Sequence, residues 1–394
     1  MAEAKVLNKE IQKFITANIG ADSSKLALQK NPFPEVNWIS IINQIVAKTK
    51  AKDKLPTFFR AENIIYPSKI SVEQTSSEKT ALYKASLVSG DTLIDLTGGF
   101  GVDDLYFSKV MKNVIHCEIE AELSKRVQHN FEILGIQNIQ CELGDSYTYL
   151  NKTQTKFDWI YIDPSRRNDT KGKVFMLKDC LPNVPELLPF YFTKSDNILI
   201  KTAPILDISA GLLELSNVKC IHIVAVDNEV KELIWELSKS FSGATTIKTI
   251  NSTSEKSEEF GFELNSNTQF SNYSLPKKYL YEPNSAIMKS GGFDEIGIQY
   301  QLDKLHQHSH LYVSEEKIDF PGRVFEIQET FSYAKSEMKS FLENKKANIT
   351  TRNFPDSVEE IRKKWKIKDG GNVYCFFTTD RNNHKIVLIC NKIK

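Results

Sequence analysis

The chain has 394 residues, of which 41% are hydrophobic and 26% charged, a balance typical of a globular protein with two or three domains. No apolar stretch approaches the roughly 18 residues that a transmembrane helix needs, and the first residues lack the apolar core of a signal peptide. The six cysteines are scattered and form no CxxC pair, which excludes a disulfide scaffold and the common zinc patterns. We therefore expect a cytoplasmic protein with no metal and no membrane contact.

The charge is balanced overall, with 51 Lys and Arg against 50 Asp and Glu, but it is unevenly distributed. Residues 323–394 contain 15 basic and 9 acidic residues, so this segment carries +6 while the remainder carries −5. A basic tail on an acidic body favours a polyanionic partner such as RNA. A merely solvated basic surface explains the same counts equally well.

The first 70 residues are predicted to form a helical domain. Apolar residues recur there at helical spacing. They are Ile11, Phe14, Ile15 and Ile19, followed after Pro34 by Trp38, Ile41, Ile42 and Ile45. Residues 55–71 contain two prolines and no clear period, so we interpret them as a linker.

Residues 71–251 show short apolar runs alternating with amphipathic segments, which predicts a parallel α/β sheet with helices on both faces. We expect helices over 121–134 and 229–240, the second capped by the polar residues 227–229. The expected strands are 92–96, 113–117, 139–143, 158–162, 197–201 and 220–226.

The C-terminal part is predicted to consist of small α+β modules. Residues 251–275 are rich in Ser and Asn and are expected to form a boundary loop. Two modules follow, over 275–322 and 323–394, and the second ends in a β-hairpin. The three histidines at 306, 308 and 310 have strand spacing, but nothing else in the sequence supports a metal site there.

The strongest local signal is the glycine-rich segment DLTGGFGVD, which begins at Asp95, follows a predicted strand and opens a helix. Ligands of open parallel sheets bind at this position, outside the carboxyl ends of the strands. The spacing is not that of the dinucleotide fingerprint, and Asp95 would repel a pyrophosphate. It could pair with a cationic group, such as the ammonium or sulfonium of S-adenosylmethionine, although a simple tight turn is the alternative.

Two further acids follow the next two predicted strands. Glu118 ends the second strand, where a carboxylate can accept the ribose hydroxyls of a nucleoside, and Asp145 follows the third, next to Ser146. Either acid could simply cap a helix. Three acids at the same edge of one sheet nevertheless favour a nucleoside site.

The fourth predicted strand ends in Asp163 and Pro164, followed by Arg166 and Arg167. Proline directs the backbone outward, so that its carbonyl and the Asp163 carboxylate can hold a target N–H group. The two arginines suit a substrate phosphate, and Lys201 at the end of the fifth strand could contact it too. A surface turn with solvated side chains is the alternative.

These motifs resemble those of class I S-adenosylmethionine-dependent methyltransferases over residues 72–251. DLTGGFGVD is similar to their first motif, HCEIE to the acidic second-strand motif, LGDS to the adenine motif and YIDPSRR to the catalytic position. SVEQTSSEKTALYKA, IKTAPILD and FPGRVFE further resemble a bacterial methyltransferase family with a THUMP-like C-terminal domain. The resemblance implies a Rossmann-like methyltransferase sheet, S-adenosyl-L-methionine as cofactor, ferredoxin-like and THUMP-like C-terminal modules, and an RNA partner.

Site residues follow from the same resemblance. The cofactor would be bound by Gln74, Ser77, Asp95, Thr97, Gly98, Gly99, Gly101, Asp103, Glu118, Asp145 and Ser146. The catalytic positions would be Asp163, Pro164 and Lys201. Substrate would contact Arg166, Arg167, Arg323, Arg362, Lys363 and Lys364.

One departure from the family pattern bears on the substrate. Base-amine methyltransferases carry an aromatic residue in the fourth position of this motif, where the chain has Arg166, so stacking would have to come from Tyr106, Phe175 or Tyr191. No cysteine lies in residues 200–204, which argues against carbon methylation through a cysteine adduct. The sequence therefore predicts methylation of a base nitrogen in tRNA or rRNA by direct in-line transfer. A methyltransferase acting on a protein or small molecule, a nucleoside-binding protein without chemistry and a nucleotide-dependent oxidoreductase remain alternatives.

Overall fold

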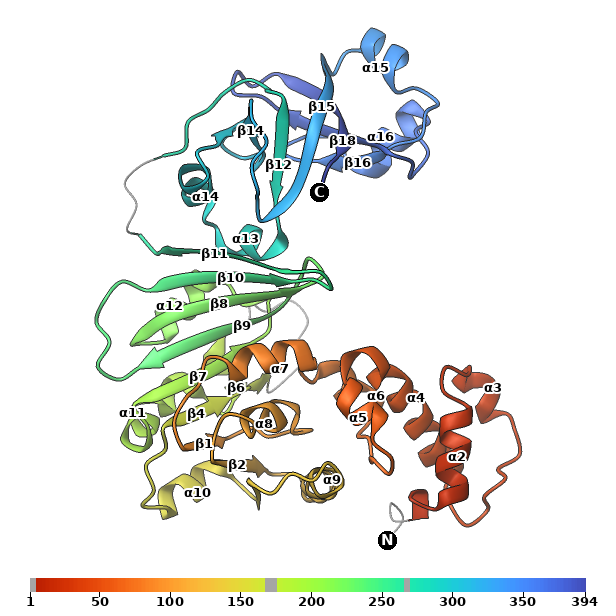
Figure 1. Cartoon of the computed structure of the whole chain (residues 1–394), viewed down its shortest axis with the longest axis vertical. Coiled ribbons are helices and arrows are strands. Elements are labelled where there is room, and N and C mark those ends of the chain that lie inside the picture. Colours follow the sequence, from red (N-terminus) through yellow and green to blue (C-terminus); the bar gives the residue numbers. More distant parts are fainter. Residues whose placement is uncertain (1–4, 167–175, 266–269) are drawn as a thin grey trace. The chain divides into compact units, whose positions relative to one another are not determined.

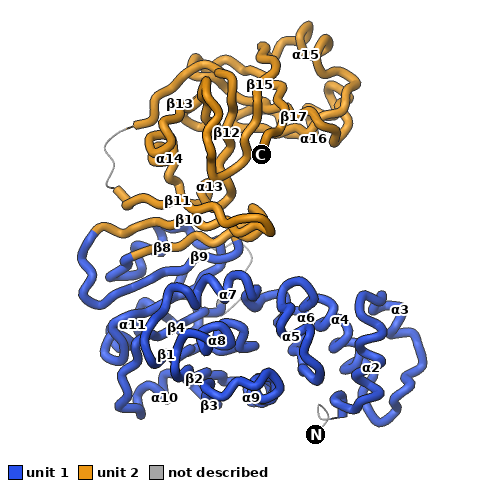
Figure 2. The backbone as a smooth tube through the Cα atoms, in the orientation of Figure 1, with its two compact units in different colours: residues 1–219, 231–243 blue, residues 220–230, 244–394 orange. Residues whose placement is uncertain are grey.

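The computed structural model describes residues 5–166, 176–265 and 270–394. The chain divides into two compact units, Met1–Lys219 with Lys231–Gly243, and Cys220–Val230 with Ala244–Lys394 (Figure 2). The backbone therefore passes between the units three times.

Unit 1 begins with a group of helices (Figure 1). Their bounds are α2 Lys9–Ala17, α3 Ser23–Ala27, α4 Trp38–Lys54, α5 Pro56–Arg60 and α6 Lys69–Gln74. Most apolar residues expected from the helical period form their core, with Ile11, Ile15, Ile41 and Ile45 at most 1% exposed, whereas Ile19 lies outside it. The prediction of a linker over 55–71 is wrong in part, because α5 starts at Pro56, where proline is compatible with the first turn of a helix.

A parallel sheet follows, in the strand order β7-β4-β1-β2-β3. The strands are β1 Thr92–Asp95, β2 Asn113–Glu118, β3 Ile139–Leu143, β4 Trp159–Ile162 and β7 Asn197–Thr202. The helices are α7 Glu78–Ala85, α8 Val102–Phe107, α9 Ala121–Ile133, α10 Ser146–Lys152, α11 Val184–Lys194 and α12 Ile208–Glu214. The first five predicted strands and their parallel pairing are confirmed. The sixth, predicted over 220–226, is a strand but is not a neighbour of β7.

The helix expected over 229–240 is wrong, because this segment is the strand β9 Glu229–Ser238, which pairs antiparallel with β7. Its residues Leu233, Ile234 and Trp235 are all fully buried, and such a continuous apolar run does not distinguish a helix from a strand buried on both faces. The polar residues before it form a turn rather than a helix cap. Asp227 and Asn228 have positive φ, as the turns of β-hairpins require.

The strand β8 Val218–Val226 enters unit 2 at Cys220 and pairs parallel with β10 Thr246–Ser252. The strand β11 Ser257–Glu263 pairs antiparallel with β10. The loop expected over 251–275 is therefore wrong where β11 lies. A seven-stranded sheet completes the unit, in the order β13-β14-β12-β15-β18-β17-β16. Its strands are β12 Tyr279–Pro283, β13 Asp303–Lys304, β14 Tyr312–Ser314, β15 Gly322–Ser332, β16 Asn348–Thr351, β17 Val373–Thr379 and β18 Lys385–Lys392.

Four helices accompany this sheet: α13 Ser285–Ser290, α14 Phe293–Gln299, α15 Lys335–Phe341 and α16 Val358–Trp365. The helix α16 starts with a capping box, in which Ser357 and Glu360 satisfy each other's backbone N–H groups. The predicted C-terminal hairpin is confirmed as β17 and β18, which pair antiparallel. Among the helices of the described residues, none is long and apolar enough to span a bilayer.

Candidate active site

The predicted functional residues of unit 1 meet at the carboxyl ends of neighbouring parallel strands. Asp95 ends β1, Glu118 ends β2, and Asp163 directly follows β4. Lys201 is the penultimate residue of β7. Because β7, β4, β1 and β2 are successive parallel neighbours, these four side chains lie along one edge of the sheet.

The glycine-rich loop after β1 is held against the end of β2 by Glu118. The Gly99 N–H donates to Glu118 Oε2 at 3.1 Å, and the Glu120 N–H donates to Oε1 at 2.7 Å. The Gly98 N–H donates to the Cys117 carbonyl at 2.9 Å. Glu118 thus fixes the loop, and each of its carboxylate oxygens keeps a second lone pair for a ligand hydroxyl.

The glycines of this loop differ in what they make possible. A Cβ on Gly98 would lie 2.2 Å from Cε1 of the buried His116. Glycine at this position therefore allows the loop to pack directly against His116 of β2. Gly99 has φ of +57°, and a Cβ there would meet only the Thr97 carbonyl oxygen, at 3.6 Å. The space above Gly99 is therefore open to a ligand, whereas Gly98 has a packing role.

Thr97 joins the cofactor side of the site to the acceptor side. Its N–H and its hydroxyl both donate to Asp95 Oδ1, at 2.7 and 3.0 Å, and its Oγ1 accepts from the Asp163 N–H at 2.7 Å. Asp95 is only 2% exposed, and burial, followed by the neighbouring Asp104, raises the pKa of its carboxyl well above the ordinary value. A cation placed against Asp95 would favour its ionised form.

Asp163 and Lys201 form an ion pair with 2.5 Å between Lys201 Nζ and Asp163 Oδ2. The Lys201 side chain is 12% exposed and that of Asp163 38%. Burial lowers the pKa of Lys201, but Asp163, Glu232 and Asp103 together outweigh burial and raise the pKa, so this lysine stays charged. A carboxylate held in place by a charged lysine is suited to orienting a substrate group.

A buried charge cluster lies within unit 1 around Asp103, the last residue of the glycine-rich segment. The Lys84 ammonium is fully buried and lies 3.0 Å from Asp103 Oδ1 and 3.0 Å from Glu232 Oε2. Asp103 Oδ2 also accepts from the Tyr161 hydroxyl at 2.7 Å and from the Ser76 hydroxyl at 2.8 Å. Asp103 therefore joins helix α8 to α7, to the segment before α7 and to β4, and its carboxylate is committed to these partners.

Sequence reasoning missed Lys84 and Glu232. Each stands among apolar residues, in TALYKA and in VKELIWE, and a charged residue in such surroundings is a signal for a buried pair. Burial raises the pKa of Glu232 against the opposing effect of Lys84 and Lys201, whereas the same two lysines outweigh burial and lower the pKa of Asp103. Asp104 and His116 form a second fully buried pair, with 2.6 Å between Asp104 Oδ2 and His116 Nδ1.

The remaining predicted cofactor residues have local structural roles. The Asp145 carboxylate accepts from the N–H and hydroxyl of Thr148, at 2.8 and 2.7 Å, and so caps α10, whose first residue is Ser146. Ser77 caps α7 by accepting from the Thr80 N–H at 3.2 Å, and Gln74 is exposed at the end of α6. A nucleoside contact of Asp145, Ser146, Ser77 or Gln74 stays a prediction.

The predicted substrate residues of unit 1 lie beyond β4. Ser165–Arg166 forms the short strand β5, which pairs with β6 Cys180–Leu181. Arg167 and Phe175 lie outside the described residues.

The other two aromatic residues considered for stacking are buried. Tyr106 and Tyr191 are 8% and 1% exposed, so neither presents a ring face to a substrate. Tyr147 is 43% exposed, and its ring centroid lies 4.9 Å from that of Phe190.

The predicted substrate residues of unit 2 are divided between paired and solvent-facing side chains. Arg323 donates from Nε to Glu282 at 2.6 Å, and Arg362 pairs with Asp369 at 2.6 Å. Lys363 is exposed, and Lys364 is 54% exposed although it lies 3.2 Å from the Tyr333 hydroxyl and 3.6 Å from Asp356 Oδ2. The two lysines are therefore better placed than the two arginines to meet a polyanion.

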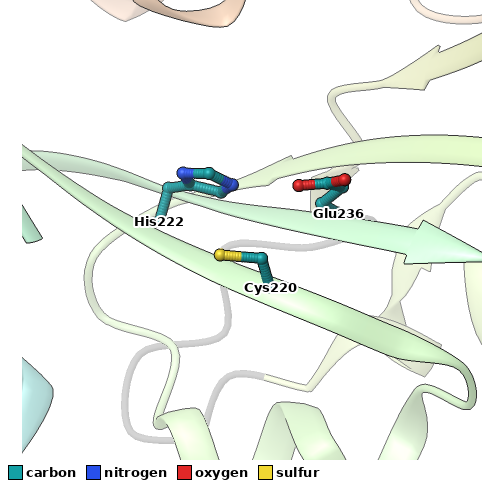
Figure 3. Close-up of side chains that lie close together, drawn as sticks. All are labelled: Cys220, His222 and Glu236. Atoms are coloured by element: carbon teal, nitrogen blue, oxygen red, sulfur yellow. The ribbon is translucent and has the colours of Figure 1, made fainter. Parts of the chain in front are cut away.

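Figure 3 shows three side chains with metal-binding atoms, those of Cys220, His222 and Glu236. Cys220 and His222 are two residues apart on β8, which places both on one face of that strand. Glu236 belongs to unit 1, where its carboxylate lies 2.7 Å from Lys219 Nζ. Because the three residues belong to different units, we assign no metal site to them.

Comparisons with known proteins agree with this architecture. The family described as a ferredoxin-like domain matches residues 279–321, and the family described as THUMP domain-like matches residues 322–392. The crystal structure of a "putative methyltransferase" from Porphyromonas gingivalis W83 is 29% identical, covers 100% of both chains and has a TM-score of 0.88. No curated protein matches the chain.

Smaller solved structures resemble only part of the chain. An rRNA methylase from Streptococcus thermophilus is 13% identical and covers 41% of this chain and 94% of its own, with a TM-score of 0.30. TrmK from M. capricolum, in complex with S-adenosyl-homocysteine, is 15% identical and covers 41% and 68%, with a TM-score of 0.32. Similarity this low carries no argument about activity.

The predicted fold class, with its methyltransferase sheet and its ferredoxin-like and THUMP-like modules, is confirmed by the family matches and by the full-length structural relative. The chain thus has the fold of a class I methyltransferase, preceded by helices and followed by a ferredoxin-like and a THUMP-like domain.

Proposed function

We propose that the chain is an S-adenosylmethionine-dependent methyltransferase that acts on RNA, at a base nitrogen, by direct in-line transfer. The observation that carries this proposal is the Thr97 hydroxyl, which hydrogen-bonds both the Asp95 carboxylate and the Asp163 backbone. The residues suited to a cationic cofactor are thereby fixed next to those suited to an acceptor group.

The residues present fit a sulfonium nucleoside. Asp95 is a buried carboxylate that a cation would stabilise, and Glu118 offers acceptors for ribose hydroxyls beside the open space above Gly99. Asp145 and Ser146 follow the next strand and would face the base. When bound there, S-adenosylmethionine would supply a methyl group already activated by its positive sulfur.

The chain's own residues would then have to position the acceptor. Asp163 and the Pro164 carbonyl would hold the N–H groups of the target nitrogen, so that its lone pair points along the sulfur–methyl bond. Such alignment lowers a barrier by about 7–11 kcal/mol in favourable cases. The ion pair with Lys201 holds the Asp163 carboxylate in place. In such a transfer the new nitrogen–methyl bond would replace the donor's sulfur–methyl bond, and the acceptor held by Asp163 and Pro164 would then lose a proton to water.

RNA as the acceptor is supported by the C-terminal part of the chain. Its THUMP-like family match covers residues 322–392, nearly all of the segment 323–394 that carries the +6 charge, and Lys363 and Lys364 reach solvent there. Residues 200–204 contain no cysteine, which favours nitrogen over carbon as the target.

The domain division and the location belong to the same proposal. We divide the chain into a helical domain (1–70), the methyltransferase domain (71–251), a ferredoxin-like module (275–322) and the THUMP-like domain (323–394). All six cysteines lie in the described part of the chain and none is in a disulfide, which suits the cytoplasm.

The test is transfer of a labelled methyl group from S-adenosylmethionine to total RNA and, separately, to total protein. We expect label in RNA and a loss of about 10²-fold or more in Asp163→Asn, which keeps the size of the side chain but removes its charge. Asp196→Asn is the matched control, because Asp196 is 73% exposed and lies outside the site. Label in protein alone would contradict the RNA assignment, and the absence of transfer to either would contradict the enzyme.

The nucleoside is identified by mass spectrometry of digested RNA from cells with and without the gene. The proposal predicts that one base-methylated nucleoside disappears with the gene. An unchanged set of nucleosides would contradict it.

A further inference from the structure

A single hydroxyl group connects the two functional loops of the proposed active site. Thr97 Oγ1 donates its proton to Asp95 Oδ1 at 3.0 Å and accepts the Asp163 N–H at 2.7 Å. The Thr97 N–H donates to the same carboxylate oxygen at 2.7 Å. The hydroxyl is thus both donor and acceptor, in a chain that runs from carboxylate to hydroxyl to backbone amide.

The hydrogen bond from the Asp163 N–H to Thr97 Oγ1 lies where the regular pairing of β1 with β4 ends. The last backbone bond between the two segments runs from the Leu96 N–H to the Tyr161 carbonyl, at 3.0 Å. Asp163 lies two residues beyond Tyr161, and Pro164 after it has no N–H that could form a further backbone hydrogen bond. The Thr97 hydroxyl therefore extends the hydrogen bonding of the strands by one bond, at the residue that would hold the acceptor.

At the other end of this series of hydrogen bonds lies the Asp95 carboxyl, whose ionisation a ligand can change. Asp95 is 2% exposed, and burial followed by Asp104 raises the pKa of its carboxyl. A cation bound next to Asp95 would favour the ionised carboxylate, and a hydrogen bond to an ionised acceptor is shorter and stronger than one to a neutral acceptor. A hydroxyl that donates more strongly also becomes a better acceptor, because linked hydrogen bonds polarise one another.

We propose that Thr97 is a positioning residue that transmits occupancy of the cofactor site to the acceptor site: a cationic group bound at Asp95 strengthens the Thr97 hydrogen bond and immobilises the backbone of Asp163. The acceptor-binding loop is then most firmly placed when the methyl donor is present. This inference rests on the proposed function, since the cation at Asp95 is that of the donor.

Amide hydrogen exchange of the Asp163 N–H, followed by NMR on the full chain, tests the coupling directly. The probe is S-adenosylmethionine at saturation, measured without RNA. We expect the Asp163 amide to exchange about tenfold more slowly with the ligand than without it in the wild type. The Leu96 amide, bonded to the Tyr161 carbonyl, is the internal reference and is expected to change much less.

Two variants distinguish an effect of the Thr97 hydroxyl from an effect on folding. Thr97→Ser keeps the hydroxyl and is expected to keep the ligand-dependent slowing, whereas Thr97→Val keeps the shape and the backbone N–H and is expected to lose it. Each variant is compared at a ligand concentration that saturates it, as measured by calorimetry. If Thr97→Val does not fold, Thr97→Ala replaces it.

Three outcomes overturn the inference. Slowing at Asp163 that persists without the hydroxyl would show that Thr97 does not transmit it. A wild type that binds the ligand with no slowing at Asp163 would refute the coupling while leaving the proposed function intact. A wild type that shows no binding by calorimetry would refute the proposed function and this inference together.

Discussion

The charged residues of the buried cluster around Asp103 and those of the THUMP-like domain are arranged in opposite ways. In unit 1, Lys84, Asp103 and Glu232 are at most 10% exposed in their side chains, and the lysine lies 3.0 Å from each carboxylate. In residues 322–392, Lys363 and Lys364 extend into solvent at the end of helix α16. Buried charges fix geometry but depend on their partners, whereas exposed charges bind polyanions with little effect on folding. The first arrangement suits chemistry and the second suits docking.

The largest effect is expected from removing the cation of the buried cluster. Lys84→Met leaves the carboxylates of Asp103 and Glu232 without their counter-ion, and breaking a buried pair in this way destabilises a protein by about 3–5 kcal/mol. The measurement is the free energy of unfolding in urea.

Lys112→Met is the matched control for this prediction. Lys112 also forms an ion pair, with Asp91 at 2.9 Å, but its side chain is 72% exposed, so we expect a change of at most about 1 kcal/mol. Adding Glu232→Gln to Lys84→Met should restore part of the loss. Equal destabilisation by the two lysine variants would contradict the contrast between buried and exposed charges.

The next effect concerns RNA binding by the exposed lysines. Replacing Lys363 and Lys364 together with alanine removes two positive charges, and each lost phosphate contact should lower the slope of log affinity against log salt by about 0.7–0.9. Filter binding of unfractionated tRNA at several salt concentrations measures the slope. An unchanged slope would show that this face does not contact RNA.

The variant Arg362→Ala compares a paired arginine with the two exposed lysines of the same helix. Its guanidinium donates to Asp369 at 2.6 Å and to the Ala347 carbonyl at 3.3 Å, so we expect this variant to lose stability while its salt slope changes less than that of the lysine variant. A fall in the slope equal to that of the lysine variant, with stability unchanged, would place Arg362 among the solvent-facing cations instead.

The smallest effect is expected at His310, a half-buried group in unit 2 whose ring stacks on Phe293 at 3.6 Å between centroids. Burial, followed by the cations Lys304, Arg352 and His308, lowers the pKa of His310 to about 4, while Asp294 opposes them. Below about pH 6.5 the unfolded chain takes up a proton that the folded chain refuses until about pH 4. Stability should therefore fall as the pH drops through this window, by about 1 kcal/mol after solvent screening.

The measurement for His310 compares unfolding in urea at pH 7 and pH 5. His310→Asn, which tolerates the positive φ of this position, should reduce the pH dependence. A variant that loses as much stability between the two pH values as the wild type would contradict the assignment. An NMR titration of the His310 ring gives its pKa independently.

Much of the central fold is predictable because each strand of the parallel sheet is an apolar run that ends in a turn residue. Leu93 and Ile94 lead into Asp95, and Ile160 to Ile162 lead into Asp163, so the sequence shows both the strand and the edge at which its acid lies. Because such strands are expected to be neighbours in a parallel sheet, the acids at their ends are predicted to belong to one site. The placement of Asp95, Glu118 and Asp163 along one edge agrees with that expectation.

The parts that sequence reasoning missed depend on partners distant in the chain. Leu233 to Trp235 form a continuous apolar run, and only pairing with β7 makes it a strand. The packing role of Gly98 depends on His116, and the burial of Lys84 depends on Glu232, which is 148 residues away. The link from Thr97 to Asp163 spans 66 residues and has no local signal in the sequence.

The most direct test of the account is calorimetry of the full chain with S-adenosylmethionine and, separately, with NAD. We predict one site that binds S-adenosylmethionine and no heat with NAD. Glu118→Gln should weaken binding by about 10- to 100-fold, the loss expected when charge-assisted hydrogen bonds are removed. Absence of S-adenosylmethionine binding, or binding that Glu118→Gln leaves unchanged, would contradict a cofactor site at this edge of the sheet.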